Sequence, residues 1–440
     1  MAKYLLIILS LFLLTCEKDV LGCTDADGDG ICDEDEQSEN NSFVIVSLQD
    51  TDAVAIVGAN NLEVEQQVSV DLNNTDCSEF LNEMNCEIAG CMWYDMGDGM
   101  SHCMAMGGAM NSPHDIVVDN TNGYWFTTAM SGGYVSMYST ETNEFLSSFT
   151  IGHMPALMAL DEVNRLIYIS RGMPNGISMP IYELSYESSM LVEVEQWDVQ
   201  FDYAHGIHFD EISGNVYVVS KTNDFIAKID PNAIQEPFIN PIIVSMDESI
   251  SDNFSIPVNR LRPIEISAKY PYMFITCSAG EWSANETYDE ISGQVQMWHM
   301  EDMDLLATYE FGTYSRPWHI EVSSVENKFF VSLSGGDGTN GSSDSGVACI
   351  EYSATDTQYS MSQSWITTSS EYEALHGITV HSGCCDGNYY VYSTGRTDGN
   401  IYKFDAQSGE QLESLNLVSS GNIRTGGIDS FIPLCDSCSD

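Results

Sequence analysis

The chain has 440 residues, 43% of them apolar, and its 14 Lys and Arg residues stand against 66 Asp and Glu residues for a formal net charge of −52. A surface this acidic repels a phosphate backbone, which excludes nucleic-acid binding and docking of a basic face on an anionic membrane. The length is sufficient for a large buried core, and the apolar content is that of a folded chain rather than a disordered one.

The N-terminal segment predicts export. It reads MAKYLLIILSLFLLTC, in which a Lys precedes an apolar run too short to cross a bilayer, as in a signal peptide. The LLTC ending resembles the lipobox of bacterial lipoproteins. By this resemblance residues 1–15 are the signal peptide and Cys16 carries the lipid, with an ordinary cleaved signal as the alternative. We expect an extracytoplasmic protein, periplasmic or on the cell surface, whose membrane contact is the lipid anchor alone.

A calcium loop is predicted in the acidic spacer 16–42. The stretch DADGDGICDEDE (25–36) places carboxylates at loop positions 1, 3, 5, 9 and 12 and a glycine at position 6. Ca²⁺ takes about six to eight oxygen ligands around a tight turn, which this spacing supplies. The stretch resembles the loops of thrombospondin type 3 repeats, and an acidic solvated linker is the alternative. The expected ligands are Asp25, Asp27, Asp29, Asp33 and Glu36.

From residue 43 onward the chain repeats one pattern. Each unit has an apolar start, an Asp or Ser, a short turn, a β-branched or aromatic strand that ends in Ser or Thr, and then further strands. Units of this kind, each with about four short strands, indicate a β-propeller. Six of them begin at His114, Pro155, His205, Arg262, Pro317 and His376.

The seventh unit is split between the two ends of the chain. Residues 43–70 match the second, third and fourth strands of a unit, and residues 426–434 match an isolated first strand. Pairing the two segments closes the ring and removes its sheet edges. The sequence therefore predicts an all-β, seven-bladed β-propeller. It comprises residues 43–73 and 113–434, with a Met-rich, Cys-rich insertion at 74–112 and a Cys-containing tail at 435–440.

The repeats resemble those of YVTN-type propellers over about 43–73 and 113–434, although insertions are frequent and the YVTN motif itself is absent. Some propellers of this type resemble lactonases, in which side chains at the channel mouth polarise a lactone carbonyl and activate water. By this resemblance His114, Arg262, Glu265 and His376 would take those roles, which implies a lactonase-like hydrolase.

Thirteen cysteines in an exported chain predict disulfides. One group is expected at a single rim of the ring and consists of Cys384, Cys385, Cys435 and Cys438. A second group, within the insertion, consists of Cys77, Cys86, Cys91 and Cys103. Cys277 and Cys349 fall in strand patterns, where we expect buried thiols.

The topology predicts a binding platform. Links from the fourth strand to the next first strand, and from the second strand to the third, meet at one face of a propeller, where functional loops gather. We expect the insertion to act as a lid there and the monomeric chain to bind a small molecule or a peptide segment. The expected ligand-binding residues are His114, His205, Arg262, Trp318, His319 and His376.

Copper at the same mouth is an alternative. Imidazole and thioether groups together suit copper by ligand softness, which predicts a copper-binding protein or a copper-dependent oxidoreductase. Each histidine also has a purely structural interpretation as a hydrogen-bonded residue at the start of a buried strand. The methionines that map to this face are Met104, Met106, Met110, Met130, Met154, Met173 and Met179.

Overall fold

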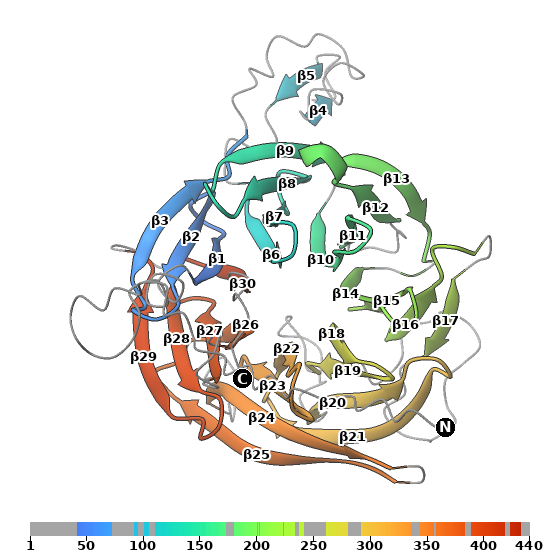
Figure 1. Ribbon diagram of the computed structural model, residues 1–440, viewed down its shortest axis with the longest axis vertical. Coiled ribbons are helices and arrows are strands. Elements are labelled where there is room, and N and C mark those ends of the chain that lie inside the picture. The colour runs from blue at the N-terminus through green and yellow to red at the C-terminus, as the bar shows by residue number, and fades with distance from the viewer. Residues whose placement is uncertain are drawn as a thin grey trace, which may run out of the picture.

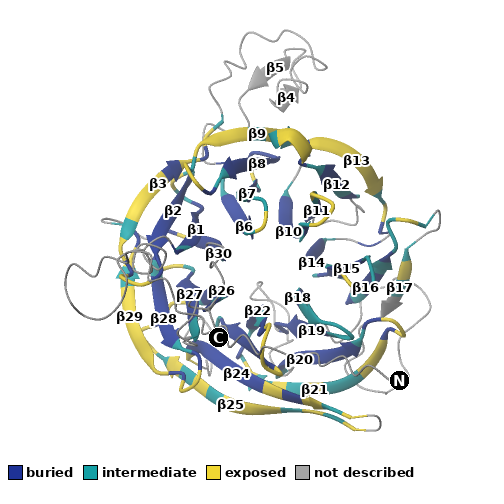
Figure 2. Cartoon of the chain, viewed as in Figure 1, coloured by how far each residue is buried: buried dark blue, intermediate teal, exposed yellow. Residues whose placement is uncertain are grey.

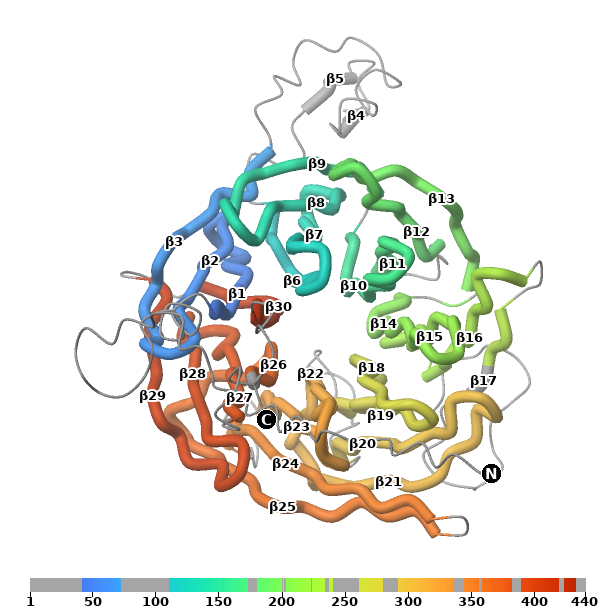
Figure 3. Tube along the Cα trace, in the orientation of Figure 1, coloured from blue at the N-terminus to red at the C-terminus, as the bar shows by residue number. Residues whose placement is uncertain are grey.

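Seven four-stranded antiparallel sheets form a closed ring of blades around a central channel in the computed structural model (Figure 1). This confirms the seven-bladed β-propeller. Figure 3 shows the first strand of each blade, from β6 to β30, lining the channel. The structure describes residues 42–72, 92–95, 101–104, 111–152, 154–172, 180–199, 201, 203–222, 224–233, 237–241, 261–279, 292–335, 344–355, 358–382, 389–418 and 423–432.

Each blade runs from an inner to an outer strand in chain order. The first three blades consist of β6 (Pro113–Asp119), β7 (Tyr124–Ala129), β8 (Tyr134–Ser139) and β9 (Phe145–Thr150); β10 (Pro155–Asp161), β11 (Leu166–Arg171), β12 (Ile181–Ser185) and β13 (Val192–Trp197); and β14 (Ala204–Asp210), β15 (Asn215–Ser220), β16 (Phe225–Ile229) and β17 (Phe238–Pro241). A 3₁₀ turn, η2 (Glu187–Ser189), lies between β12 and β13.

Three further blades follow in the same order. They consist of β18 (Pro263–Lys269), β19 (Tyr272–Cys277), β20 (Ser292–His299) and β21 (Asp304–Thr313); β22 (Pro317–Val322), β23 (Lys328–Leu333), β24 (Ser345–Ala354) and β25 (Tyr359–Ser369); and β26 (Leu375–Ser382), β27 (Tyr389–Gly395), β28 (Asn400–Asp405) and β29 (Gln411–Asn416).

The closing blade joins the two ends of the described chain, as the split repeat predicted. Its order is β30 (Thr425–Phe431), β1 (Phe43–Leu48), β2 (Ala53–Gly58) and β3 (Val64–Ser69). β1 and β30 run antiparallel, with Phe43 opposite Phe431 and Ile45 opposite Asp429. The pairing completes the fourth strand of this blade and closes the ring.

The core lies between adjacent blades. Figure 2 shows buried inner strands and exposed outer strands such as β9 and β13. In one cluster Tyr168 of one blade packs with Val216 and Val218 of the next. Cys277 and Cys349 are buried free thiols, as expected.

The insertion contributes one short antiparallel hairpin, β4 (Met92–Asp95) and β5 (Ser101–Met104). The role of the insertion as a lid stays a prediction. No helix in the described part of the chain is long and apolar enough to span a membrane. The lipidation site Cys16, the calcium loop 25–36 and the two disulfide groups concern side chains outside the described residues and stay predictions.

Every inner strand carries an irregularity just after its first residue. In β6, Pro113 pairs with Ala129 but Ile116 pairs with Thr127, so one extra residue is accommodated. The same shift occurs in β10, β14, β18, β22 and β26, and β30 has its counterpart against β1. Such a bulge re-aims the side chains beside it. Here it affects the second and third residues of each inner strand.

In five of the seven blades a hydroxyl group stabilises the bulge and links it to the next blade. Thr128 accepts a hydrogen bond from the backbone N–H of Asp115 (3.0 Å) and donates one to the carbonyl of Ala156 in the next blade (2.9 Å). The same double interaction recurs at Ser170, Thr276, Ser332 and Thr394. It explains why the repeats end their second strand in Ser or Thr.

One blade departs from this pattern. Val219 occupies the hydroxyl position in β15, so it cannot bond the next blade. There the imidazole Nδ1 of His205 reaches the carbonyl of Ile264 instead, at 2.8 Å. The carbonyl of Ile264 therefore has a hydrogen-bond partner, as the equivalent carbonyls have in the blades with a hydroxyl.

The residue before the inner strand has a left-handed backbone in six of the seven blades, all but the closing blade. Its carbonyl accepts a hydrogen bond from the residue that follows the second strand of the same blade, for example Tyr203 from Lys221 (3.0 Å) and Ala374 from Arg396 (3.1 Å). Arg262 occupies this position, with φ of 57°, so it precedes β18 rather than beginning it as expected. The residues with this backbone are Ser112, Met154, Tyr203, Arg262, Arg316 and Ala374.

We predict that Thr276→Val destabilises the ring by about 1–3 kcal/mol, because the N–H of Glu265 and the carbonyl of Trp318 lose their partner. The same change at Thr308, exposed on β21, should cost less than about 0.5 kcal/mol. Urea unfolding of both variants measures the difference. Equal midpoints for the two variants would contradict the role assigned to the hydroxyl.

Candidate functional site

Four histidines gather at the end of the channel where the inner strands begin, which we call the channel mouth. His114, His205 and His376 are the second residues of β6, β14 and β26. In β22 Trp318 takes that position, and His319 is the third residue. Ring centroids are 6.2 Å apart for His114 and His205, 6.1 Å for His114 and His376, and 4.6 Å for His319 and His376. The bulges therefore bring together the histidines that the sequence pointed to.

Two of these rings have tautomers set by their neighbours. The amide nitrogen of Gln49 lies 2.6 Å from Nδ1 of His114 and can only donate, so the ring proton is on Nε2. The guanidinium of Arg396 donates to Nε2 of His376 at 3.0 Å, so that ring carries its proton on Nδ1. Both protonated nitrogens are buried and lack a hydrogen-bond partner among the described residues.

Both rings are neutral donors. Burial, and then the charge of Arg396, hold the pKa of His114 and of His376 well below the ordinary value. Burial and then Lys221 do the same for His205. The mouth thus offers uncharged N–H groups rather than imidazolium ions at neutral pH.

His319 is arranged differently. Its Nδ1 lies 2.9 Å from a carboxylate oxygen of Glu265, and its buried Nε2 has no partner among the described residues. A carboxylate that holds Nδ1–H leaves the lone pair of Nε2 available as a proton acceptor. The same Glu265 oxygen accepts the backbone N–H of Ile320 at 2.7 Å, which fixes its position.

Cationic side chains surround the histidines. Lys221 lies over the rings of Trp318 and Tyr203, its Nζ 4.7 Å and 5.3 Å from their centroids. Burial and then the charges of Arg262 and Arg396 hold the pKa of Lys221 well below its ordinary value. The pKa of Arg396 is lowered to about 10, first by burial. No carboxylate of the described residues forms an ion pair with Lys221 or Arg396.

The sequence analysis missed Gln49, Lys221 and Arg396. All three follow a second strand, and their N–H groups bond the residue before the inner strand of the same blade. Aligning the repeats on the Ser or Thr near the end of the second strand would have brought these positions into one set. Arg262 belongs to the neighbouring position before the inner strand.

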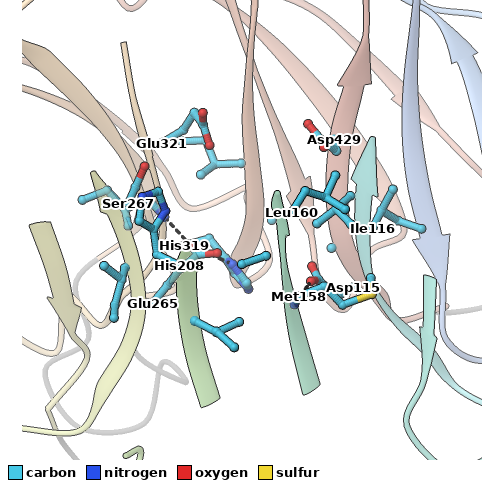
Figure 4. Close-up of a pocket in the computed structure, with 18 of the residues that line it drawn as sticks. Asp115, Ile116, Met158, Leu160, His208, Glu265, Ser267, His319, Glu321 and Asp429 are labelled. Atoms are coloured by element: carbon cyan, nitrogen blue, oxygen red, sulfur yellow. Dashed lines mark hydrogen bonds and ion pairs between the residues drawn. The ribbon is translucent and has the colours of Figure 1, made fainter. Parts of the chain in front are cut away.

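Below the mouth the channel widens into a cavity of about 380 Å³ lined by carboxylates. Figure 4 shows Asp115, Glu321, Asp429 and His208 projecting into it from different inner strands. Asp115 accepts the N–H of Met158, and Asp429 that of Val118, each at 2.8 Å. These two acids therefore satisfy backbone groups of the next blade.

Glu321 has no such partner among the described residues, and burial raises its pKa well above the ordinary value. Burial likewise raises the pKa of Asp115 strongly and that of Asp429 to about 7. The upper end of the channel thus carries the guanidinium of Arg396 and the amine of Lys221, and its interior is acidic and proton-binding. A negatively charged group is favoured at the mouth and disfavoured further in.

Among the described residues, no group of three or more His, Cys, Asp or Glu side chains has the geometry to hold a metal ion. Met130 and Met154 follow β7 and precede β10, on the face where they were expected. The side chains of the other methionines proposed for copper lie outside the described residues, as does His153, so copper binding stays a prediction.

Comparison with known proteins supports the fold alone. No protein-family model matches the chain, and no curated protein matches its sequence. Among solved structures, the chain is similar to a functionally unknown protein from Desulfotomaculum acetoxidans, with a TM-score of 0.59 and 11% identity over 89% of this chain and 99% of that one.

Two further similar structures carry lactonase names. One is the periplasmic gluconolactonase of Pseudomonas aeruginosa, with a TM-score of 0.53 and 12% identity over 88% of this chain and 99% of that one. The other is a protein from Bacteroides uniformis proposed to be a 6-phosphogluconolactonase, with a TM-score of 0.54 and 11% identity over 88% and 99%. At these identities the similarity establishes a shared propeller architecture.

We predict that Asp429 and Glu321 lower the stability of the protein as pH rises from about 4 to about 7, while the buried histidines, whose pKa values are depressed, act in the opposite direction. In that window the unfolded chain releases the protons of Asp429 and Glu321, whereas the folded channel retains them. Glu321→Gln should reduce this slope and raise the melting temperature at pH 8 by about 2 °C or more, and exposed Glu310→Gln should change neither. Thermal unfolding between pH 4 and pH 8 measures the effect. The same pH dependence of the melting temperature in the natural chain and in Glu321→Gln would refute it.

Proposed function

We propose that this propeller is a binding protein for a small organic anion, a carboxylate, which it holds at the channel mouth. The observation that carries the proposal is the gathering of Lys221, Arg262 and Arg396 in a chain with only 14 Lys and Arg residues and a net charge of −52. Grouped cations repel one another, and a bound anion removes that repulsion.

The histidines supply the remaining donors. Nε2–H of His114 and Nδ1–H of His376 are buried without a partner among the described residues, and an unmet buried donor costs about 1–3 kcal/mol. A carboxylate oxygen accepts such hydrogen bonds while Arg396 balances its charge. Burial in the acid-lined interior of the channel disfavours a second charged group, so we expect selection of a ligand with one acidic end.

Binding is tested with gluconate as the probe and glucose as its neutral counterpart, by calorimetric titration at low salt. Arg396→Gln should weaken gluconate binding about tenfold or more, because it removes a buried charge that contacts the site. The matched control is Arg165→Gln on the opposite face, where Arg165 is exposed and bonds Asn122.

Affinity should fall with added NaCl, since the attraction is electrostatic. Equal affinity for glucose and gluconate, or equal weakening by the two arginine variants, would contradict an anion site at the mouth. An extracytoplasmic location, predicted from the N-terminal segment, would make this a protein that meets its ligand outside the cytoplasm.

A second candidate is lactone hydrolysis, which the Glu265–His319 pair favours. A neutral Nε2 of His319 can take a proton from water, and the N–H donors of His114 and His376 can stabilise the oxyanion that forms on the carbonyl. Two structures of similar fold carry gluconolactonase or 6-phosphogluconolactonase names, which makes glucono-δ-lactone the substrate to try. The hydrolysis product is the sugar acid that the first proposal binds.

If the chain hydrolyses this lactone, His319→Gln should lower kcat about 100-fold or more while gluconate still binds. Glu321→Gln, which lines the same cavity without contacting a described imidazole, should leave kcat unchanged. A pH-stat assay measures ring opening. A rate with the natural chain that equals the rate in buffer would eliminate hydrolysis and leave the binding proposal standing.

A further inference from the structure

A second cavity lies between two blades, on the face opposite the channel mouth. Its volume is about 460 Å³. The hairpin turn between β10 and β11, the hairpin turn between β14 and β15, and the turn after β16 contribute to its wall, in the region where Figure 1 shows these two blades side by side. Asp161, Glu183 and Glu211 line it, and among the described residues no Lys, Arg or His does so.

Two other interfaces between blades show what the fold places at the equivalent position. There a Tyr on the second strand faces a Lys on the third: Tyr217 is opposite Lys228, and Tyr392 is opposite Lys403. In the blade beside the cavity Tyr168 is opposite Glu183. The three pairs occupy the same positions in their blades.

In both Lys interfaces the ammonium group bonds the turn between the third and fourth strands of the next blade. Lys228 donates to the carbonyls of Met300 (3.4 Å) and Glu301 (3.2 Å). Lys403 donates to those of Ala59 (3.0 Å) and Asn60 (3.3 Å). The fold thus has an ammonium position built from turn carbonyls beside a tyrosine.

The tyrosines take part in the same contact. Tyr217 donates to the carbonyl of Met300 (3.1 Å), and Tyr392 donates to the carbonyl of Ala59 (2.5 Å). Each pair therefore directs its phenol and its ammonium at the first carbonyl of the turn.

At the third interface the ammonium is missing. The corresponding turn begins at Asp230 and Pro231, directly after β16, and Pro231 lines the cavity. The ionised carboxylate of Glu183 cannot donate to a carbonyl, yet its side chain is only 6% exposed and has no hydrogen bond or ion pair among the described residues.

The negative charges around Glu183 favour a cation at this position. Glu195 stands directly across from it on β13, and like charges in opposed strand positions repel. Burial, then Glu195 and Asp161, raise the pKa of Glu183 to about 7. The ring of Tyr168 stacks on Phe209 at 5.3 Å, which adds an aromatic surface to the wall.

We propose that this cavity binds an organic ammonium ion, a primary amine, whose charged end occupies the position that the lysine ammonium fills in the two other interfaces. Glu183 balances the charge, the carbonyls of the turn after β16 accept the N–H groups, and Tyr168 offers its ring to the cation. A carbon chain of the amine fits the remaining volume, which is within the usual size range of small-molecule pockets.

The probe is n-butylamine, titrated calorimetrically into the full chain near pH 8, with the melting temperature followed in parallel. We expect saturable binding and a rise in melting temperature. Glu183→Gln should weaken binding about tenfold or more, because the buried charge partner is lost. Glu193→Gln, an exposed charge change on β13, should bind like the natural chain.

Glu183→Lys tests the assignment from the opposite direction. This variant carries its own ammonium, so it should melt at a higher temperature than the natural chain and no longer respond to butylamine. If Glu183→Lys fails to fold, the comparison of butylamine binding by Glu183→Gln and by the natural chain tests the proposal by itself.

Absence of saturable binding, or equal binding by the natural chain and Glu183→Gln, would overturn the proposal. So would a response to CaCl₂ that Glu183→Gln abolishes when butylamine gives none, since that would make the cavity a metal site.

Discussion

In five of the seven blades a single hydroxyl group links neighbouring inner strands of this propeller. It accepts the backbone N–H beside the bulge of its own inner strand and donates to a carbonyl of the next inner strand, as Thr128 does between Asp115 and Ala156. Because inner strands of neighbouring blades do not pair as a sheet, these groups would otherwise be buried and unmet. The bond therefore fixes both the bulge and the spacing of the blades.

The same constraint creates the candidate site. A bulge at the same position of every blade directs the second and third residues of each inner strand toward the channel. The residue that follows the second strand lies beside them, because its N–H bonds the residue before the inner strand. His114, His376 and Arg396 meet because they occupy these repeated positions, although they are far apart in the chain. The acidic residues lie one layer deeper, where Asp115, Glu265 and Asp429 satisfy N–H groups of the following blade. Two layers of opposite charge thus follow from one backbone arrangement.

The strands, the closing blade and the four histidines of the mouth could be predicted because strand alternation and the Ser or Thr ending are local sequence signals. The start of one inner strand was predicted one residue too early, at Arg262, because the left-handed position before the strand has no strong residue preference. Lys221 and Arg396 were missed because they lie in links, whose side-chain direction depends on a backbone bond to a distant residue. The cavity at Glu183 could not be predicted from the sequence either. It is recognised only by comparing the third strands of three blades, of which two carry a lysine where this blade carries Glu183.

The account centres on a positively charged mouth in a strongly acidic protein. The most direct measurement is anomalous diffraction from crystals soaked in bromide, which locates bound anions without assuming a ligand. The account predicts the strongest bromide peak beside the guanidinium of Arg396 and the ammonium of Lys221, and its loss in Arg396→Gln. Bromide bound elsewhere, with none at the mouth of the natural chain, would contradict it.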